Sequence, residues 1–165
     1  TVTDREGVQR VATTFKEKVE MLKTQFFPEP READLSDIEG THYPEPVVTS
    51  DGISREEVHE ALRWVAKDKA PGPDQIPNRV LKAAQEWLIP RLHTIFNAAL
   101  RNGYHPRDWK RAVTLTLRKP NKVDYITPKS YRPIILLNTS GKLLELVITR
   151  KISKLAEANS LLPEI

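Results

Sequence analysis

The stretch "KDKAPGPDQIP", residues 67–77, constrains this chain more than any other, because three prolines and a glycine fall within residues 71–77. Proline fixes φ and disfavours helical geometry in the preceding residue, so Pro71 and Pro73 push Ala70 and Gly72 out of a helix. A helix before this stretch must therefore end, and the chain must continue as a stiff, extended connection. Asp74 is placed to cap the next helix, with Pro77 in its first turn.

Lys67 and Lys69 stand directly beside this stiff connection. A rigid backbone is useful where two ammonium groups must meet a phosphate at a fixed place. The alternative interpretation is a rigid corner between two helices whose lysines are simply solvated. The stretch by itself leaves both interpretations open.

The residues before this stretch predict a helix, a linker and a second helix. Apolar residues at three- and four-residue intervals predict one amphipathic helix over residues 4–27, with Thr3 or Asp4 as its N-cap. Residues 28–52 hold four prolines, two glycines and many acids, which is typical of a linker. Ser54 and Glu57 form the pattern of a capping box, flanked by Ile53 and Val58 as a hydrophobic staple.

The residues that follow the proline-rich stretch predict two further helices, over residues 78–88 and 90–103. Pro90 is expected to divide them by a kink or a break. Gly103 is well placed to end the second one. The predicted organisation is therefore an N-terminal helix (1–27), an acidic, proline-rich linker (28–52) and one main region (53–165).

From residue 111 the periodicity changes from helical to alternating. Val113, Leu115 and Leu117 share one face of a predicted half-buried strand, and residues 131–138 form a second strand candidate. The two strands can pair as an antiparallel ribbon, and residues 140–158 predict a closing helix. The fold class is therefore α+β: a helix-rich N-terminal part, a small antiparallel sheet and a C-terminal helix.

The charge of the chain is strongly asymmetric. Residues 1–62 hold 7 Lys+Arg and 14 Asp+Glu, whereas residues 63–165 hold 19 and 8. A basic region of this size indicates a nucleic-acid partner, although two solvated surfaces of opposite sign would give the same count. Without cysteine, thiol catalysis, disulfides and thiolate zinc sites are excluded, and the four histidines lack metal-ligand spacing. No apolar run approaches the length of a membrane span, so we expect no membrane partner.

A second basic cluster lies in "LRKPNKVDYITPKSYRPI", residues 117–134. Basic residues interleaved with aromatic ones can grip phosphates while the rings meet bases or sugars. Pro133 holds the backbone of Arg132 extended, and the guanidinium fork suits phosphate oxygens. The pattern favours phosphate binding over an exposed hairpin that its charges keep soluble. The cluster consists of Arg118, Lys119, Lys122, Lys129 and Arg132, with Tyr125 and Tyr131 between them.

The order and spacing of five motifs resemble those of the reverse transcriptases of non-LTR, LINE-like retrotransposons. The motifs are "KAPGPDQIPNRVLKAA", Trp109, "LRKPNKVDY", "PKSYRPIILLNTSGKLLE" and "NSLLP", and the resemblance covers about residues 53–163. It implies a right-hand polymerase fold, of which this region would be the N-terminal extension and fingers, with palm and thumb absent.

The resemblance also implies roles for individual residues. Lys119 and Arg132 match the basic positions that hold the triphosphate of the incoming nucleotide. The template-contacting positions are Lys67, Lys69, Gly72, Lys122 and Lys129. Lys142 and Glu145 match the start of the following helix, where an ion pair is expected, and Gln75 stands where the family often has glycine.

The function that the resemblance implies is that of a fragment of an RNA-directed DNA polymerase. Its partners would be an RNA template, the RNA/DNA duplex and, in the complete enzyme, a deoxynucleoside triphosphate. Nucleotidyl transfer needs metal-binding carboxylates, and the family's palm aspartate motifs have no counterpart here. We therefore expect no cofactor in this chain, Mg²⁺ in the complete polymerase, and no polymerisation by this chain alone.

Two alternatives stay open, a stand-alone RNA-binding module and a non-functional relic of a retrotransposon. The chain starts at Thr1 and not at Met, which favours a fragment or a processed product. The family resemblance implies an intracellular location, in the nucleus by family habit.

Overall fold

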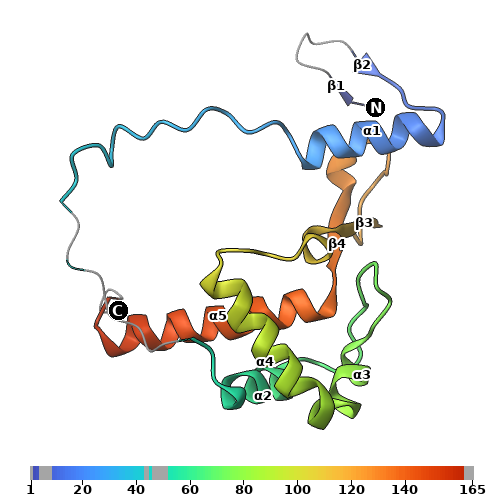
Figure 1. Ribbon diagram of the computed structural model, residues 1–165. Coiled ribbons are helices and arrows are strands. Elements are labelled where there is room, and N and C mark those ends of the chain that lie inside the picture. The colour runs from blue at the N-terminus through green and yellow to red at the C-terminus, as the bar shows by residue number, and fades with distance from the viewer. Residues whose placement is uncertain (1, 4–8, 43–44, 46–51, 162–165) are drawn as a thin grey trace. The chain divides into compact units, whose positions relative to one another are not determined.

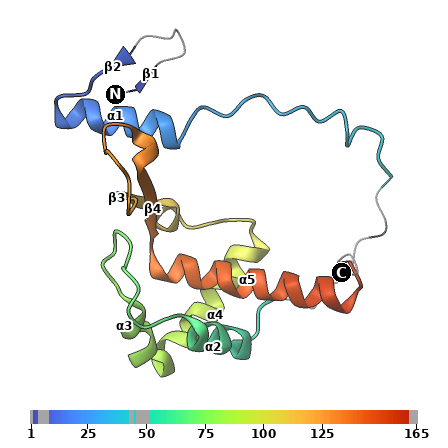
Figure 2. The ribbon, with the colours of Figure 1, turned by 180° about the vertical axis from the view of Figure 1, so that it is seen from behind.

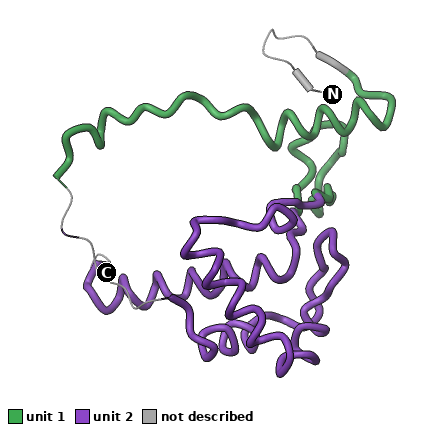
Figure 3. Tube along the Cα trace, viewed as in Figure 1, with its two compact units in different colours: residues 1–44, 114–134 green, residues 45–113, 135–165 purple. Residues whose placement is uncertain are grey.

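The computed structural model describes residues 2–3, 9–42, 45 and 52–161. The chain divides into two compact units (Figure 3). Unit 1 comprises residues 1–44 and 114–134, and unit 2 comprises residues 45–113 and 135–165. None of the helices in the described ranges is long and apolar enough to cross a membrane.

Unit 2 is built from helices that surround one hydrophobic core (Figures 1 and 2). They are α2 (Arg55–Trp64), α3 (Asn78–Ala83), α4 (Gln85–Arg101), the 3-10 helix η1 (Arg107–Lys110) and α5 (Thr139–Ala158). Helix α2 packs against both α4 and α5. The core consists of Ile53, Val58, Ala61, Leu62, Leu81, Leu92, Phe96, Leu143, Leu144 and Val147.

Unit 1 contains α1 (Phe15–Phe26) and the 3-10 helix η2 (Pro128–Ser130). Strands β1 (Val2–Thr3) and β2 (Gln9–Arg10) pair antiparallel, with Val2 opposite Arg10. A second two-stranded antiparallel sheet is formed by β3 (Ala112–Arg118) and β4 (Tyr131–Leu137). The predicted α+β class, with its small sheet and C-terminal helix, is confirmed.

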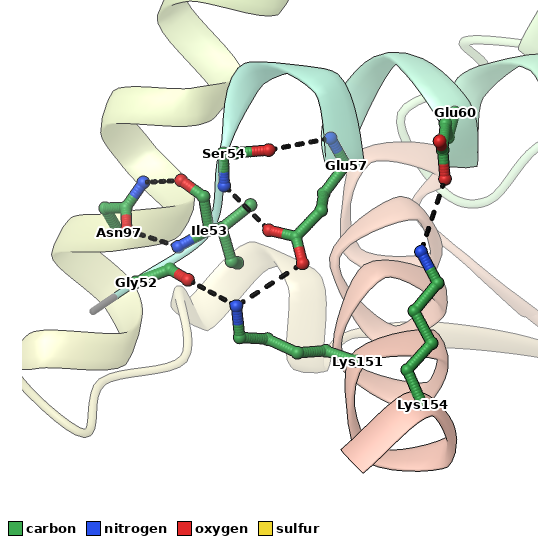
Figure 4. A network of polar contacts seen from close by, with 8 residues as sticks. All are labelled: Gly52, Ile53, Ser54, Glu57, Glu60, Asn97, Lys151 and Lys154. Atoms are coloured by element: carbon green, nitrogen blue, oxygen red, sulfur yellow. Dashed lines mark hydrogen bonds and ion pairs between the residues drawn. The ribbon is translucent and has the colours of Figure 1, made fainter. Parts of the chain in front are cut away.

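The predicted start of α2 is confirmed in detail (Figure 4). The Glu57 N–H donates to Ser54 Oγ at 3.1 Å, and the Ser54 N–H donates to Glu57 Oε2 at 2.7 Å. Ile53 and Val58, on either side of this capping box, are both buried in the core. Asn97 on α4 holds Ile53 by accepting from its N–H and donating to its carbonyl, each at 2.8 Å. These contacts fix the start of α2 against α4.

The N-terminal helix is shorter than predicted, because it begins at Phe15 and not near Asp4. Thr3 lies in β1 and is no helix cap, and Asp4 lies outside the described residues. Thr14 and Glu17 form the capping box that sets the start of α1. The prediction followed the spacing of the apolar residues and missed this Thr-x-x-Glu signal.

Two predicted boundaries around the proline-rich stretch are also wrong. Asp74 does not cap α3: Pro77 occupies that position without a side-chain hydrogen bond. The Asp74 carboxylate instead accepts from the Ile76 N–H at 3.2 Å, a local turn that competes with capping. Pro90 lies inside α4, and the break between α3 and α4 falls at Ala84, which has φ −100° and ψ 17°.

The end of α4 is as predicted. Gly103 has a φ of +56°, which glycine adopts without strain. Its N–H donates to the Leu100 carbonyl, and the Tyr104 N–H donates to the Ala99 carbonyl at 2.9 Å. This pair of hydrogen bonds is the Schellman arrangement that closes a helix.

The alternation of its residues predicts that β3 is half-buried, and this prediction is wrong. All seven of its residues are exposed, and the predicted inner face keeps exposures of 43% at Val113, 46% at Leu115 and 52% at Leu117. Alternation shows which residues share a face, but it does not show whether another element covers that face.

Candidate nucleic-acid interface

The proline-rich stretch lies directly against the junction between β4 and α5. Gly72 is buried there, and a β-carbon on it would collide with the Leu137 carbonyl group and lie 2.5 Å from the Asn138 nitrogen. Any side chain would therefore separate the two segments. The glycine is required because two backbones meet at this point.

Asn138 and Thr139, at the start of α5, bind the same stretch. Asn138 Oδ1 accepts from the Asp74 N–H at 3.1 Å, and Asn138 Nδ2 donates to the Asp108 carbonyl at 3.0 Å. The Thr139 hydroxyl donates to the Ile76 carbonyl at 2.5 Å. Asn138 and Thr139 are both buried, so these bonds are partly shielded from water.

Lys67 and Lys69 lie in the preceding segment, which α3 holds. Asn78 Nδ2 donates to the Ala66 carbonyl at 2.6 Å, and Arg79 forms an ion pair with Asp68. Both lysines are exposed, and within the described residues neither ammonium group has an ion pair or a hydrogen bond. The backbone is thus fixed while the two charges stay available.

Gln75 has a φ of +56°, in the left-handed region that favours glycine. Its N–H donates to the Gly72 carbonyl at 3.0 Å, which closes a turn over Pro73 and Asp74. This geometry explains why the resemblance implies glycine here. Glutamine is accommodated at this position, at a cost of about 1 kcal/mol.

The second basic cluster is organised by its two tyrosines. The Lys119 N–H donates to the Ser130 carbonyl at 2.8 Å, and the Tyr125 hydroxyl donates to the Lys119 carbonyl at 2.8 Å. The Tyr131 hydroxyl donates to the Tyr125 carbonyl at 3.2 Å, and the two rings meet edge to face at 6.0 Å. The backbone of Lys119 is therefore held on both sides.

The other basic residues of the cluster are close in sequence to these hydrogen-bonded residues. Arg118 lies 4.8 Å from the centre of the Tyr125 ring, which sets its direction by a cation–π contact. Arg132 follows Ser130 by two residues, so Lys119 and Arg132 lie at the same end of the β3–β4 ribbon. Lys122, Lys129 and Arg132 are all exposed and, within the described residues, have no ion pair.

The candidate residues thus fall into two groups. Lys67, Lys69 and Gly72 belong to unit 2, whereas Lys119, Lys122, Lys129 and Arg132 belong to unit 1. Lys142 and Glu145 form no ion pair among the described residues. The ion pairs of α5 are instead made by Lys151 with Glu57, at 3.3 Å, and by Lys154 with Glu60, at 3.7 Å (Figure 4).

Sequence reasoning missed Asn138 and the two tyrosine hydroxyls as positioning groups. Asn138 is separated from Asp74 by 64 residues, and no local pattern indicates such a contact. For the tyrosines a signal exists, since they stand between basic residues, but that pattern predicts contacts of the rings with bases or sugars and does not indicate hydrogen bonds from the hydroxyls to the backbone. In the part of the chain that the structure describes, no cluster of three or more acidic or histidine side chains could hold a metal ion.

Comparison with known proteins decides the family. A probable RNA-directed DNA polymerase from transposon BS of Drosophila melanogaster is 38% identical over 68% of this chain. A probable RNA-directed DNA polymerase from transposon X-element of the same species is 38% identical over 66%. The RNA-directed DNA polymerase from mobile element jockey of Drosophila funebris is 30% identical over 98%. The chain belongs to the reverse transcriptases of non-LTR retrotransposons.

The chain spans only part of the reverse transcriptases that it matches, namely 12% of the BS protein and 17% of the jockey protein. This coverage is consistent with a fragment of such an enzyme. No protein-family model matches it. The relatives are RNA-directed DNA polymerases by name, and polymerases of this kind use nucleic-acid templates, nucleotide substrates and metal ions.

Two motifs that carry the likeness to reverse transcriptases meet in unit 2. The "KAPGPD" motif supplies Gly72, which lies on the backbone just before "NTSGKLLE". The same downstream motif supplies Gly141, where a β-carbon would lie 3.0 Å from Trp109 Cβ. Trp109 in turn contacts Phe96 edge to face at 5.8 Å. In this chain the reverse transcriptase motifs therefore also join the proline-rich stretch, η1 and α5.

Proposed function

We propose that this chain supplies phosphate contacts to a reverse transcriptase, as its N-terminal extension and fingers. Lys119 and Arg132 bind the triphosphate of the incoming deoxynucleotide. The observation that carries this assignment is the fixed backbone of Lys119. Its N–H donates to the Ser130 carbonyl, and its carbonyl accepts from the Tyr125 hydroxyl. A fixed backbone lowers the entropy that a flexible lysine would lose on binding a phosphate.

Template contacts are the second part of the proposal. Lys67 and Lys69 bind the template backbone from the segment held by α3, and Gly72 sets the position of the adjoining loop. Lys122 and Lys129 contribute further contacts from the ribbon. Their exposed ammonium groups support this role, since phosphate contacts come mainly from lysine and arginine.

In the complete polymerase we expect an RNA template, an RNA/DNA duplex, deoxynucleoside triphosphates and Mg²⁺. Under this proposal the present chain binds, and nucleotidyl transfer belongs to the complete enzyme. Metal-bound carboxylates would there position the attacking hydroxyl and stabilise the leaving phosphate.

The triphosphate contact is tested by NMR titration of the labelled chain. A deoxynucleoside triphosphate should shift the amide signals of Lys119 and Arg132, and the monophosphate should shift them less at equal concentration. Lys119→Gln and Arg132→Gln should each weaken the triphosphate titration. Lys18→Gln, on the exposed face of α1, is the control and should leave it unchanged. Equal shifts with both nucleotides would contradict a triphosphate site.

The template contact is tested with a single-stranded RNA and the double variant Lys67→Gln, Lys69→Gln. At low salt we expect binding to be weaker by roughly tenfold, because the variant cannot form two of the lysine–phosphate pairs. Arg101→Gln with Lys110→Gln removes the same charge from exposed positions outside both groups. If this control weakens binding equally, Lys67 and Lys69 have no special role.

A further inference from the structure

A pocket outside both basic groups lies between α2 and α5 of unit 2. It has a volume of about 490 Å³ and is lined by Glu60, Arg63, Trp64 and Arg150. Trp64 is the last residue of α2, and its side chain is 72% exposed. The guanidinium carbon of Arg150 lies 4.7 Å from the centre of the indole ring. We call this site the Trp64 pocket.

Among the described residues of unit 2, Trp64 contributes little to the packing, because it is 72% exposed. A tryptophan usually buries most of its area, so one that stays largely exposed beside a cavity marks a binding surface. Arg150 covers part of the ring and fixes its orientation by a cation–π contact. The rest of the ring is open to a planar ligand.

The charge around the pocket is positive. Glu60 is paired with Lys154, and the neighbouring Glu57 is paired with Lys151, so lysines compensate both carboxylates. Among the described residues, neither Arg63 nor Arg150 has an ion pair. Two uncompensated guanidinium groups beside an exposed indole attract an anion that also carries an aromatic ring.

We propose that the Trp64 pocket binds one nucleotide of a single-stranded nucleic acid. Its base stacks on the open face of Trp64, and its phosphate contacts Arg63 and Arg150. The cavity volume lies in the range of small-ligand sites, about 300–1,000 Å³. Trp64 precedes Lys67 by three residues, so the pocket extends the proposed template path. The choice of a nucleic acid as ligand therefore rests on the proposed function.

The test uses fluorescence anisotropy with a labelled single-stranded oligoadenylate of about ten nucleotides and an abasic strand of equal length. Trp64→Leu should weaken oligoadenylate binding by about tenfold, because stacking on an aromatic side chain contributes that much per base. It should leave binding of the abasic strand unchanged. Trp87→Leu is the matched control, since Trp87 is also 72% exposed but does not line the pocket.

The role of Arg150 is tested by two substitutions. Arg150→Gln should weaken binding of both strands, and Arg150→Lys should restore most of the abasic binding because the charge returns. Thermal unfolding of each variant checks the fold. If Trp64→Leu lowers the melting temperature without changing the affinity for oligoadenylate, the indole is a structural residue and the proposal is wrong.

The result separates this inference from the proposed function. If the Lys67 and Lys69 variant loses binding and Trp64→Leu does not, the proposed template contacts are supported and the proposed nucleotide site at the Trp64 pocket is refuted. If only Trp64→Leu loses binding, the nucleotide site is supported and the lysine contacts are refuted. Equal losses for Trp64→Leu and Trp87→Leu would also overturn the assignment to this pocket.

Discussion

Gly72 is the residue on which the position of the proline-rich stretch most depends. Its α-carbon lies so close to the Leu137–Asn138 backbone that no side chain fits. The prolines stiffen the stretch, but stiffness alone does not fix its position. Its position is fixed by the contact with Leu137 and by the hydrogen bond from the Asp74 N–H to Asn138. The lysines just before it are therefore presented by tertiary contacts as well as by local stiffness.

Gly72→Ala should lower the free energy of unfolding of the chain by about 2–3 kcal/mol, because the added methyl group collides with backbone atoms that cannot move independently. Urea unfolding followed by circular dichroism measures the change. Gly40→Ala is the reference variant: nothing lies within 4 Å of its β-carbon position, so its loss comes from the φ of +76° alone and should be about 1 kcal/mol. A loss at Gly72 no larger than that at Gly40 would contradict the close packing.

Gln75→Gly tests the backbone at the neighbouring position. The left-handed φ of Gln75 is strained for glutamine and free of strain for glycine. We expect the substitution to raise the free energy of unfolding by about 0.5 kcal/mol, since relief of about 1 kcal/mol is partly offset by the freedom of glycine in the unfolded chain. Gln75→Ala should give no such gain, and an equal gain would argue against the strained geometry.

At the scale of elements, the β3–β4 ribbon owes its order to hydrogen bonds and not to a covering layer. β3 is exposed along its whole length. The connection from Pro120 to Ser130 is folded back by Tyr125 and Tyr131, whose hydroxyls bind backbone carbonyls. The position of Lys119 therefore depends on a side chain six residues away.

Tyr125→Phe should loosen the backbone at Lys119 by removing one hydrogen bond, which contributes about 1 kcal/mol. Hydrogen exchange of the Lys119 amide should become faster, and the triphosphate titration should weaken while the edge-to-face packing of the two rings stays intact. Tyr104→Phe, an exposed tyrosine with no hydroxyl hydrogen bond among the described residues, is the control. Unchanged exchange at Lys119 would show that the hydroxyl does not hold it.

Helix α1 provides a prediction on pH. Hydrogen bonds from the backbone N–H groups of Thr14 and Thr13 lower the pKa of Glu17. The charged carboxylate therefore stabilises the helix start above its ordinary pKa, and this stability is lost as the pH falls through the lowered value. The amide signals of Thr13 and Thr14 should titrate together in that range, and Glu17→Gln should abolish the titration. Titration that persists in this variant would exclude Glu17 as its origin.

Local sequence signals predicted the helices and strands well, but they predicted poorly which elements contact one another in space. Ser54 with Glu57 marked the start of α2, and Gly103 marked the end of α4, because caps act within a few residues. Alternation correctly predicted β3, and residues 131–138 were correctly predicted to form its partner strand β4. The contact of Gly72 with Leu137, and the exposure of β3, depend on residues far along the chain. No local pattern encodes them.

At the scale of the whole molecule, the two units differ in how they are stabilised. Every residue of the hydrophobic core cluster belongs to unit 2, whereas α1 of unit 1 buries none of its residues. Burial of apolar area is the main source of stability. The chain therefore combines one well-packed unit with one that little apolar packing stabilises.

Hydrogen exchange measured by mass spectrometry should separate the units. We expect strong protection in α2, α4 and α5, and exchange faster by at least about tenfold in α1 and β3, because sparsely packed regions open locally. Equal protection in all of these elements would mean that the chain unfolds as one cooperative body. That outcome would argue against the division into a stable and a weakly stabilised unit.

The most direct test of phosphate binding is the salt dependence of binding to single-stranded RNA. Two variants, each with six basic residues changed to glutamine, have the same net charge. The site variant changes Lys67, Lys69, Lys119, Lys122, Lys129 and Arg132, and the control variant changes Lys16, Lys18, Arg31, Arg101, Arg107 and Lys110.

A plot of log K against log salt should become shallower by about 0.7 for each phosphate contact that a variant removes. We therefore predict a slope shallower by up to about 4 in the site variant, and a slope close to that of the unmodified chain in the control. Equal slopes in the two variants would mean that only the overall charge matters, and would contradict the assignment of these six residues to phosphate binding.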